Sequence, residues 1–390
     1  METPMATAPI QTPVRDASPD AMERLLEAVR SRRSEFSQNQ QISADVVEMM
    51  KAAGVYRACV ARELGGDELS PAAFLRMIER ISQADGSAGW VASFGVSASY
   101  LASLRLDTLR QMYANGPDVV FSGMIFPPQA AFPVGDALQV KGRWSWGSGS
   151  TGADYIGVGV KVEGDASTGG LPLVAVMPAD KVQIVRNWNV IGLKGTGSHD
   201  VVVDNVLVPR DWTFVRGSAP NLDGALFRYP AMALAAQVLA VVALGVGRAA
   251  IEELMDYAAG RTSITGAPTL ANRPIVQTDL ARAEATLRSA RAFFYESTEE
   301  AWDALLRGDV LTPKQIAMVR LGASHAARAG SDVATAVYRM SGTTGIFEGH
   351  PVAHYMHDAM IVPQHAFLAD GTFESAGKVL FGQSPPPGFP

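Results

Sequence analysis

The segment KGRWSWGSGSTGADY, residues 141–155, joins two runs of β-type sequence through a turn rich in glycine and serine. It lies within residues 117–212, where short runs rich in Val, Ile and Leu are separated by Gly, Pro and Asp. Short strands that follow one another without helices between them favour an antiparallel barrel or sandwich. The runs that we predict as strands are residues 137–146, 155–162, 171–177, 182–185 and 200–208.

Outward from this region the sequence is helical on both sides. Ser70-Pro71 and Thr312-Pro313 each place a capping residue before a proline, which is a common start of a helix. Long patterns rich in Ala, Leu and Arg cover residues 277–306 and 313–340, and helices of this length favour an antiparallel bundle. The sequence therefore predicts an α+β protein with a disordered tail (1–18), an N-terminal helical domain (19–116), a central antiparallel β-barrel domain (117–215) and a C-terminal four-helix bundle domain (222–390).

Composition and charge argue against several classes of protein. A net charge of −6 over 390 residues does not suit a nucleic-acid-binding surface. The single cysteine, Cys59, cannot form an internal disulfide, which fits a reducing cytoplasm. The apolar run AMALAAQVLAVVALGVG, residues 231–247, is shorter than the ~20 residues that span a bilayer and is rich in Ala and Gly. We therefore expect a cytoplasmic protein without a membrane span, in which this run is a buried helix.

Four segments in order resemble the acyl-CoA dehydrogenase superfamily, and within it the two-component (group D) flavin-dependent monooxygenase branch. Residues 141–155 are similar to the strand and turn that hold the flavin ring, and NWNVIGLKGTGSHDVVVDNVLVP (187–209) to the segment whose Trp flanks that ring. RTSITGAPTLANRPIVQTDLARAEATLRSA, from residue 261, resembles the stretch that binds flavin phosphate, usually across a subunit interface. SGTTGIFEGHPVAHYMHDAMIVPQH (341–365) resembles the end of the same branch, which includes aromatic hydroxylases and indole or indole-acetate oxygenase components.

The resemblance implies reduced FAD or FMN as cofactor, supplied by a separate NAD(P)H-dependent flavin reductase, with O2 as co-substrate, in a homotetramer. A flavin site needs aromatic walls, small residues and donors at the polar edge of the ring, and residues 144–149 offer all three. By family position Ser148 would form a hydrogen bond near flavin N5 and Trp188 would pack at the ring; a plain turn and a plain core position are the alternative interpretations. The expected cofactor-binding residues are Trp144, Trp146, Ser148, Gly149, Trp188, Arg261 and Gln277.

The C-terminal segment separates two activities of the superfamily. An acyl-CoA dehydrogenase needs a carboxylate base, but HDAMIVPQHAF (357–367) has no carboxylate after Asp358. The monooxygenase branch has a histidine in this stretch, matched here by His365. In that branch reduced flavin and O2 give a C4a-hydroperoxide, and an imidazole with a pKa near ~6.5 can donate or hold the proton that it needs. We therefore expect His365 and Ser148 to be catalytic in the hydroxylation of a small aromatic or heteroaromatic compound.

The segment GWVASFGVSASYLASL, residues 89–104, bears on the substrate. Relatives that act on phenols often have a His here, and this chain has serines and Tyr100 instead. Either a Ser or Tyr takes over the deprotonation of a phenol, or the substrate is not a phenol. An electron-rich ring such as indole needs no deprotonation before oxygenation, so an indole-type substrate is attractive beside a phenolic one. The expected substrate-binding residues are Trp90, Phe94, Ser97, Tyr100 and Phe126, with Phe132 as a further pocket candidate.

Two other functions and one other kind of site stay open or are set aside at this point. An acyl-CoA dehydrogenase or related flavin oxidase could keep its base on another helix, and a non-catalytic relative would only bind a small ligand. His350, His354 and His357 are spaced along one stretch as metal ligands can be. No HExxH arrangement accompanies them and Pro351 disturbs the turn, so we predict no metal site.

Overall fold

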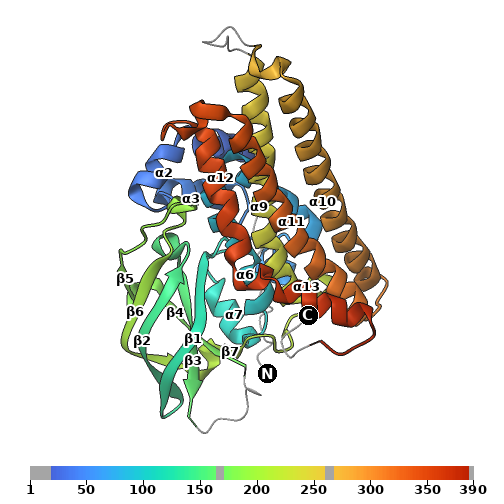
Figure 1. Ribbon diagram of the computed structural model, residues 1–390. Helices are drawn as coiled ribbons and strands as arrows, with labels where there is room; N and C mark the ends of the chain where they lie inside the picture. The colour runs from blue at the N-terminus through green and yellow to red at the C-terminus, as the bar shows by residue number, and fades with distance from the viewer. Residues whose placement is uncertain (1–18, 164–170, 260–267, 386–390) are drawn as a thin grey trace.

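The computed structural model describes residues 19–163, 171–259 and 268–385 and places helices from both ends of the chain beside one sheet, which lies at the lower left of Figure 1. The N-terminal helices are α1 (Pro19–Ser31), α2 (Arg33–Asn39), α3 (Ala44–Ala52), α4 (Pro71–Ala84), α5 (Gly86–Ala92), α6 (Ser97–Leu101) and α7 (Leu106–Met112). The strands are β1 (Phe121–Val134), β2 (Ala137–Gly147), β3 (Tyr155–Val162), β4 (Leu173–Pro178), β5 (Gln183–Val185), β6 (His199–Pro209) and β7 (Thr213–Val215). The C-terminal helices are α8 (Ala225–Arg228), α9 (Ala231–Ala259), α10 (Pro274–Leu306), α11 (Pro313–Met340), α12 (Pro351–Ile361) and α13 (Gly371–Leu380).

The predicted order of helices, strands and helices is the order observed. Two of the predicted helix starts are also in place: Ser70 Oγ accepts the Ala73 N–H (3.3 Å), and Thr312 forms a capping box with Gln315. The domain limits 19–116, 117–215 and 222–390 stay predictions. The tail 1–18 lies outside the described residues.

The seven strands form one mixed sheet in the order β5-β6-β2-β1-β3-β4-β7. β1 pairs with β2 antiparallel but with β3 parallel, so the predicted all-antiparallel arrangement was wrong. Among the described residues β5 and β7 are edge strands and the sheet is open, so closure into a barrel is not confirmed.

The parallel pair arises from the path of the chain after β2. Strands without helices between them suggest antiparallel pairing, but here β2 itself is part of the crossover from β1 to β3. After β2 the chain crosses the start of β1, where the N–H groups of Asp154 and Tyr155 both donate to the Val120 carbonyl (2.8 and 3.1 Å). β3 therefore begins at the same end of the sheet as β1 and runs parallel to it.

Helix α9 lies among the other long helices (Figure 1) and packs against α4, α11 and α12. It is long and apolar enough to cross a membrane by composition, yet 94% of its most apolar stretch is buried inside the protein, as in a core helix. The prediction of a buried helix at residues 231–247 is thus confirmed. Because α4 comes from the N-terminal part, both ends of the chain share one hydrophobic core, and a separate C-terminal four-helix bundle is not confirmed.

The sheet has buried residues on both faces, as β4 shows. Val174 and Val176 belong to the core shared with the helices, whereas Ala175 and Met177 belong to a second core on the opposite face. Val174 also lines a cavity, which places that cavity between the sheet and the helices.

Candidate active site

A cavity of about 600 Å³ lies at this junction, with walls from all three parts of the chain. Aromatic and aliphatic side chains make up most of its walls, and no Asp or Glu is among the described residues that line it. The described lining residues therefore offer no carboxylate base of the kind that an acyl-CoA dehydrogenase needs. The predicted residues that meet in the cavity are Trp90, Phe94, Tyr100, Phe126, Trp146, Ser148, Trp188 and His365.

Trp144 and Trp146 are two positions apart on β2 yet lie in different environments. A spacing of two normally puts both side chains on one face of a strand. Here the register with β6 shifts between Trp144 and Gly147, and Trp146 has a φ of 63°, which is rare for an aromatic residue. Trp146 lines the cavity with 68% of its surface exposed. Contrary to expectation, Trp144 does not: it is buried within the sheet, and its Nε1 donates to the Gly159 carbonyl (3.0 Å).

A chain of hydroxyl groups runs from the cavity into the loop before β6. The Trp90 Nε1–H donates to Ser148 Oγ (3.3 Å), which lies 2.6 Å from Ser198 Oγ. Ser198 Oγ lies 2.7 Å from Thr196 Oγ1, which donates to the Leu193 carbonyl (2.9 Å). The Ser148 hydroxyl is thus held in a defined position. Ser198 and Thr196 were not singled out from the sequence, although the Gly-rich segment GTGSHD that contains them was.

Trp188 is fixed at both ends of the residue. Its Nε1 donates to the Leu193 carbonyl (3.2 Å), and its backbone N–H donates to Nδ1 of His199 (3.0 Å). His199 is fully buried and also accepts the Asn187 N–H (3.1 Å). A lone histidine at the start of a strand carries no signal of this role in the sequence. It is a positioning residue that the sequence analysis missed.

His365 is held at the cavity wall by Trp90 and Phe367. Its ring makes edge contacts with both of theirs, and its Nδ1 accepts the Phe367 N–H (3.2 Å). Burial, and after it the charge of Arg216, lower the pKa of His365 from 6.5 to about 4. At neutral pH the imidazole is therefore uncharged, with its proton on Nε2. The expected pKa near ~6.5 does not hold in this environment.

Arg216 is a cation in a cavity with mostly apolar walls, and it was not among the residues predicted for the site. It directly follows β7, with its guanidinium carbon 5.7 Å from the centre of the Tyr100 ring and 5.1 Å from that of Phe367. Its Nε donates to Met232 Sδ (3.2 Å). No ion pair joins it to a carboxylate in the part of the chain that the structure describes, and burial lowers its pKa. In the sequence it looks like any arginine after a strand.

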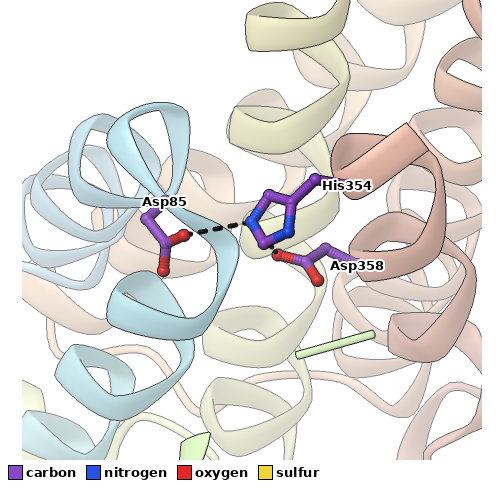
Figure 2. Close-up of side chains that lie close together, drawn as sticks. All are labelled: Asp85, His354 and Asp358. Carbon is purple, nitrogen blue, oxygen red and sulfur yellow. Dashed lines mark hydrogen bonds and ion pairs between the residues drawn. The ribbon is translucent and has the colours of Figure 1, made fainter. Parts of the chain in front are cut away.

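A buried charged cluster supports the cavity wall from outside (Figure 2). His354 Nε2 lies 3.2 Å from Asp85 Oδ2 and 3.3 Å from Asp358 Oδ2, and both carboxylates are 1% exposed. The charge of Asp358 is the main reason that the pKa of His354 rises to about 9. Asp358 Oδ1 also accepts the Leu193 N–H (2.6 Å), so the cluster holds the residue to which the Trp188 ring and the hydroxyl chain are bonded.

The three side chains of this cluster also have the spacing of a metal site, with ligand atoms within 4.8 Å of one another. We interpret the group as an ion-pair cluster, because His354 Nε2 lies within ion-pairing distance of both carboxylates. His350 does not join it: its Nδ1 accepts the Val352 N–H at the start of α12 (3.3 Å).

The remaining predicted residues lie elsewhere. Ser97 is buried behind the cavity, with Oγ 2.9 Å from the Tyr100 hydroxyl, and Gly149 forms the left-handed turn after Ser148, with a φ of 70°. Phe132 is 57% exposed on β1 and does not line the cavity. Gln277 is exposed at the start of α10, where it donates to the Ala271 carbonyl (2.9 Å), and Arg261 lies outside the described residues.

The cavity has what a flavin ring requires. Trp146 and Trp188 supply aromatic walls, Ser148 supplies a hydroxyl held in place, and the interior is apolar. A flat apolar ring with one polar edge is bound by this combination. The residues present therefore fit the cofactor that the sequence predicts.

Comparison with known proteins agrees with this site. A family model described as acyl-CoA dehydrogenase, C-terminal domain, matches residues 237–370. The chain is 52% identical to an indole-3-acetate monooxygenase of Pseudomonas putida over 96% of both chains. It is 25% identical to the oxygenase subunit HsaA of a flavin-dependent monooxygenase from Rhodococcus jostii (strain RHA1), over 90% of this chain and 97% of that one. The fold matches that of XiaF from Streptomyces sp. in complex with FADH2 and glycerol, with a TM-score of 0.88 at 20% identity over 95% of this chain and 96% of that one.

Three observations lead to one conclusion. They are the fold, the aromatic cavity with no carboxylate among its described lining residues, and 52% identity to a monooxygenase over 96% of both chains. This chain belongs to the flavin-dependent monooxygenases of the acyl-CoA dehydrogenase fold, the oxygenase components that use reduced flavin and O2 to hydroxylate aromatic or heteroaromatic compounds.

Proposed function

We propose that this enzyme oxygenates the indole ring of indole-3-acetate, the compound in the name of its 52% identical relative. The observation that carries the proposal is the cavity, which is aromatic on most sides and has a guanidinium but no carboxylate among its described lining residues. An electron-rich bicyclic ring suits such walls. The absence of a histidine in residues 89–104 supports a substrate that needs no deprotonation.

The residues around the cavity have separate tasks in this proposal. Reduced flavin, when bound, supplies with O2 the oxygen atom that enters the substrate. Trp146 and Trp188 hold the ring, and Ser148 Oγ faces its polar edge as a hydrogen-bond acceptor, because Thr196 donates to Leu193 and the proton of Ser148 is therefore donated to Ser198. The apolar walls exclude water, which protects the oxygen transfer from side reactions.

His365 acts as a fixed hydrogen-bond donor rather than as a general acid that gives up and takes back a proton. Its pKa of about 4 keeps it uncharged at neutral pH, and its Nδ1 is already occupied by the Phe367 N–H. The Nε2–H is therefore the group that it can offer to the reacting oxygen. This refines the role predicted for His365 from the sequence.

The substrate is tested by turnover with isotope-labelled O2. The purified enzyme is mixed with chemically reduced FMN or FAD, labelled O2 and indole-3-acetate, and the products are analysed by mass spectrometry. We expect one labelled oxygen atom in the indole product. Consumption of the reduced flavin with hydrogen peroxide as the only oxygen product would contradict the proposal.

The role of His365 is tested by His365→Ala. Loss of one fixed donor to the reacting oxygen should lower the fraction of flavin oxidation that yields product by about tenfold, with a matching rise in hydrogen peroxide. His325, exposed on α11 and outside the cavity, provides the control variant His325→Ala. Full coupling in His365→Ala would remove His365 from the mechanism.

The quaternary structure and partners belong to the same proposal. A separate NAD(P)H-dependent reductase supplies the reduced flavin, and the chain acts as a cytoplasmic homotetramer. Support for the binding of flavin across subunits comes from a second cavity of about 860 Å³ between α9, α10 and α11. Arg273, Arg282 and Arg339 line it together with Asp279 and Asp332, and Arg282 is paired with Asp279 (3.1 Å). Gln277 lies on the same turn of α10 as two of the lining residues, so this cavity is the proposed place for the phosphate end of a flavin from a neighbouring subunit.

A further inference from the structure

Arg216 is a half-buried cation in a cavity with mostly apolar walls. A guanidinium that is partly withdrawn from water usually has a carboxylate partner, because desolvation of an unpaired charge is unfavourable. In the described chain Arg216 has two aromatic rings and a thioether as neighbours instead, and burial lowers its pKa. The described lining residues of the cavity include no acid that could neutralise it.

Its neighbours hold Arg216 without using its strongest donors. Tyr100 and Phe367 flank the guanidinium plane, and Met232 takes only the Nε–H. The Tyr100 hydroxyl is itself engaged with Ser97 Oγ (2.9 Å). The two terminal nitrogens are thus without a carboxylate partner in the described chain, and their planar fork has the geometry that binds a carboxylate with two hydrogen bonds.

We infer that Arg216 binds the carboxylate of the substrate and so makes the enzyme selective for aromatic acids over neutral aromatic compounds of the same shape. The inference rests on the proposed function, which it deepens by assigning the anionic part of the substrate to one residue. Arg216 and His365 both line the cavity and both contact the Phe367 ring, at 5.1 Å for the guanidinium carbon and 4.9 Å for the centre of the imidazole ring. A carboxylate on Arg216 therefore places the aromatic ring beside the residue that acts on the reacting oxygen.

A purely structural role for Arg216 makes a different prediction. If its contacts with Tyr100 and Phe367 only stabilise the wall, its removal should affect charged and neutral substrates alike. Two substrates of nearly the same shape separate the two roles: indole-3-acetate, which carries a carboxylate, and indole-3-acetamide, which is neutral. The measured quantity is the ratio of kcat/KM for the acetate to that for the acetamide.

The variants are Arg216→Gln, Arg216→Lys and the control Arg210→Gln, an exposed arginine six residues earlier. We expect Arg216→Gln to lower kcat/KM for the acetate by roughly 30- to 100-fold, mainly through KM, and that for the acetamide by no more than about fivefold. Arg216→Lys should keep part of the preference because it keeps the charge but not the fork. Arg210→Gln should leave the ratio as it is in the wild type.

A binding measurement separates this inference from the proposed function. Calorimetric titration of the flavin-loaded enzyme with indole-3-acetate and indole-3-acetamide needs no turnover. If the wild type binds the acetate no more tightly than the acetamide, or if Arg216→Gln weakens both equally, the inference is overturned. If the acetate binds tightly through Arg216 but is not oxygenated, the inference stands and the proposed reaction fails.

Discussion

Two histidines eleven residues apart, His354 and His365, lie in opposite electrostatic environments. His354 lies between two buried carboxylates, and the charge of Asp358 in particular raises its pKa to about 9. His365 lies in an apolar cavity, where burial and then Arg216 lower its pKa to about 4. One imidazole is thus charged and the other neutral at the same pH, although both belong to the same C-terminal segment.

The difference shows how this fold keeps its paired charges outside the cavity, whose described lining residues include the cation Arg216 but no acid. The paired charges are in the cluster of Asp85, His354 and Asp358, which holds Leu193 by its N–H (2.6 Å). Leu193 in turn accepts from Trp188 and Thr196. The cluster can therefore fix the wall of the cavity while the interior stays apolar, apart from the one guanidinium.

Removing a carboxylate from the cluster should have the largest effect on the free energy of unfolding. Asp358→Ala removes a buried carboxylate, leaves the Leu193 N–H without its acceptor and leaves His354 with half of its ion pair. We expect the free energy of unfolding to fall by about 3–5 kcal/mol, measured by urea denaturation near pH 7. Asp370→Ala, which removes the exposed partner of Arg328, should cost less than about 1 kcal/mol. Equal losses in the two variants would show that the cluster does not support the fold.

The charge on His354 should be detectable as a loss of stability in alkaline solution. Because its folded pKa is raised, its stabilisation is present below pH 6.5 and is lost as the pH rises through about 9. We expect the wild type to lose about 2 kcal/mol of unfolding free energy over this range beyond what His354→Gln loses. A constant difference between the two proteins from pH 6 to pH 10 would mean that His354 is not charged in the folded state.

The neutral state of His365 should make the free energy of unfolding depend on pH in the opposite direction, by a smaller amount and in acidic solution. Its folded pKa is lowered, so the unfolded chain takes up a proton more readily and stability is lost as the pH falls from 6.5 towards 4. The loss should be about 1 kcal/mol, since His365 is only partly buried and solvent screening at its exposed side weakens the effect. His365→Gln should lack this loss. Thermal unfolding between pH 7 and pH 4 measures it, and parallel curves for both proteins would contradict it.

Much of the fold could be predicted because it follows from local patterns. Proline and capping residues mark the starts of α4 and α11, and the apolar run at residues 231–247 predicts a core helix. The pairing of β1 with β3 could not be predicted in this way, because it depends on where residues 148–154 cross the sheet. Strand direction is a property of the chain path, which periodicity does not report.

The site residues also differ in whether a local sequence pattern marks them. Ser148, Trp188 and His365 could be singled out from the family motifs around them, and they meet at the cavity, while their roles stay predictions. Arg216 and His199 were missed because their roles depend on neighbours distant in the sequence, and neither lies in a motif of its own type. Trp144 was misplaced because a two-residue spacing predicts one face, and the positive φ of Trp146 breaks that rule.

That same φ angle has an optical consequence. Trp144 and Trp146 put one indole in a dry core and the other at the mouth of the cavity, so their emission should differ in wavelength and in sensitivity to a bound ring. A flavin that stacks on Trp146 would quench its emission, together with that of Trp90 and Trp188, which line the same cavity. Subtracting the spectrum of Trp146→Phe from that of the wild type would isolate the signal. The backbone at one residue thus gives the enzyme a native fluorescent reporter of cofactor arrival, with no added label.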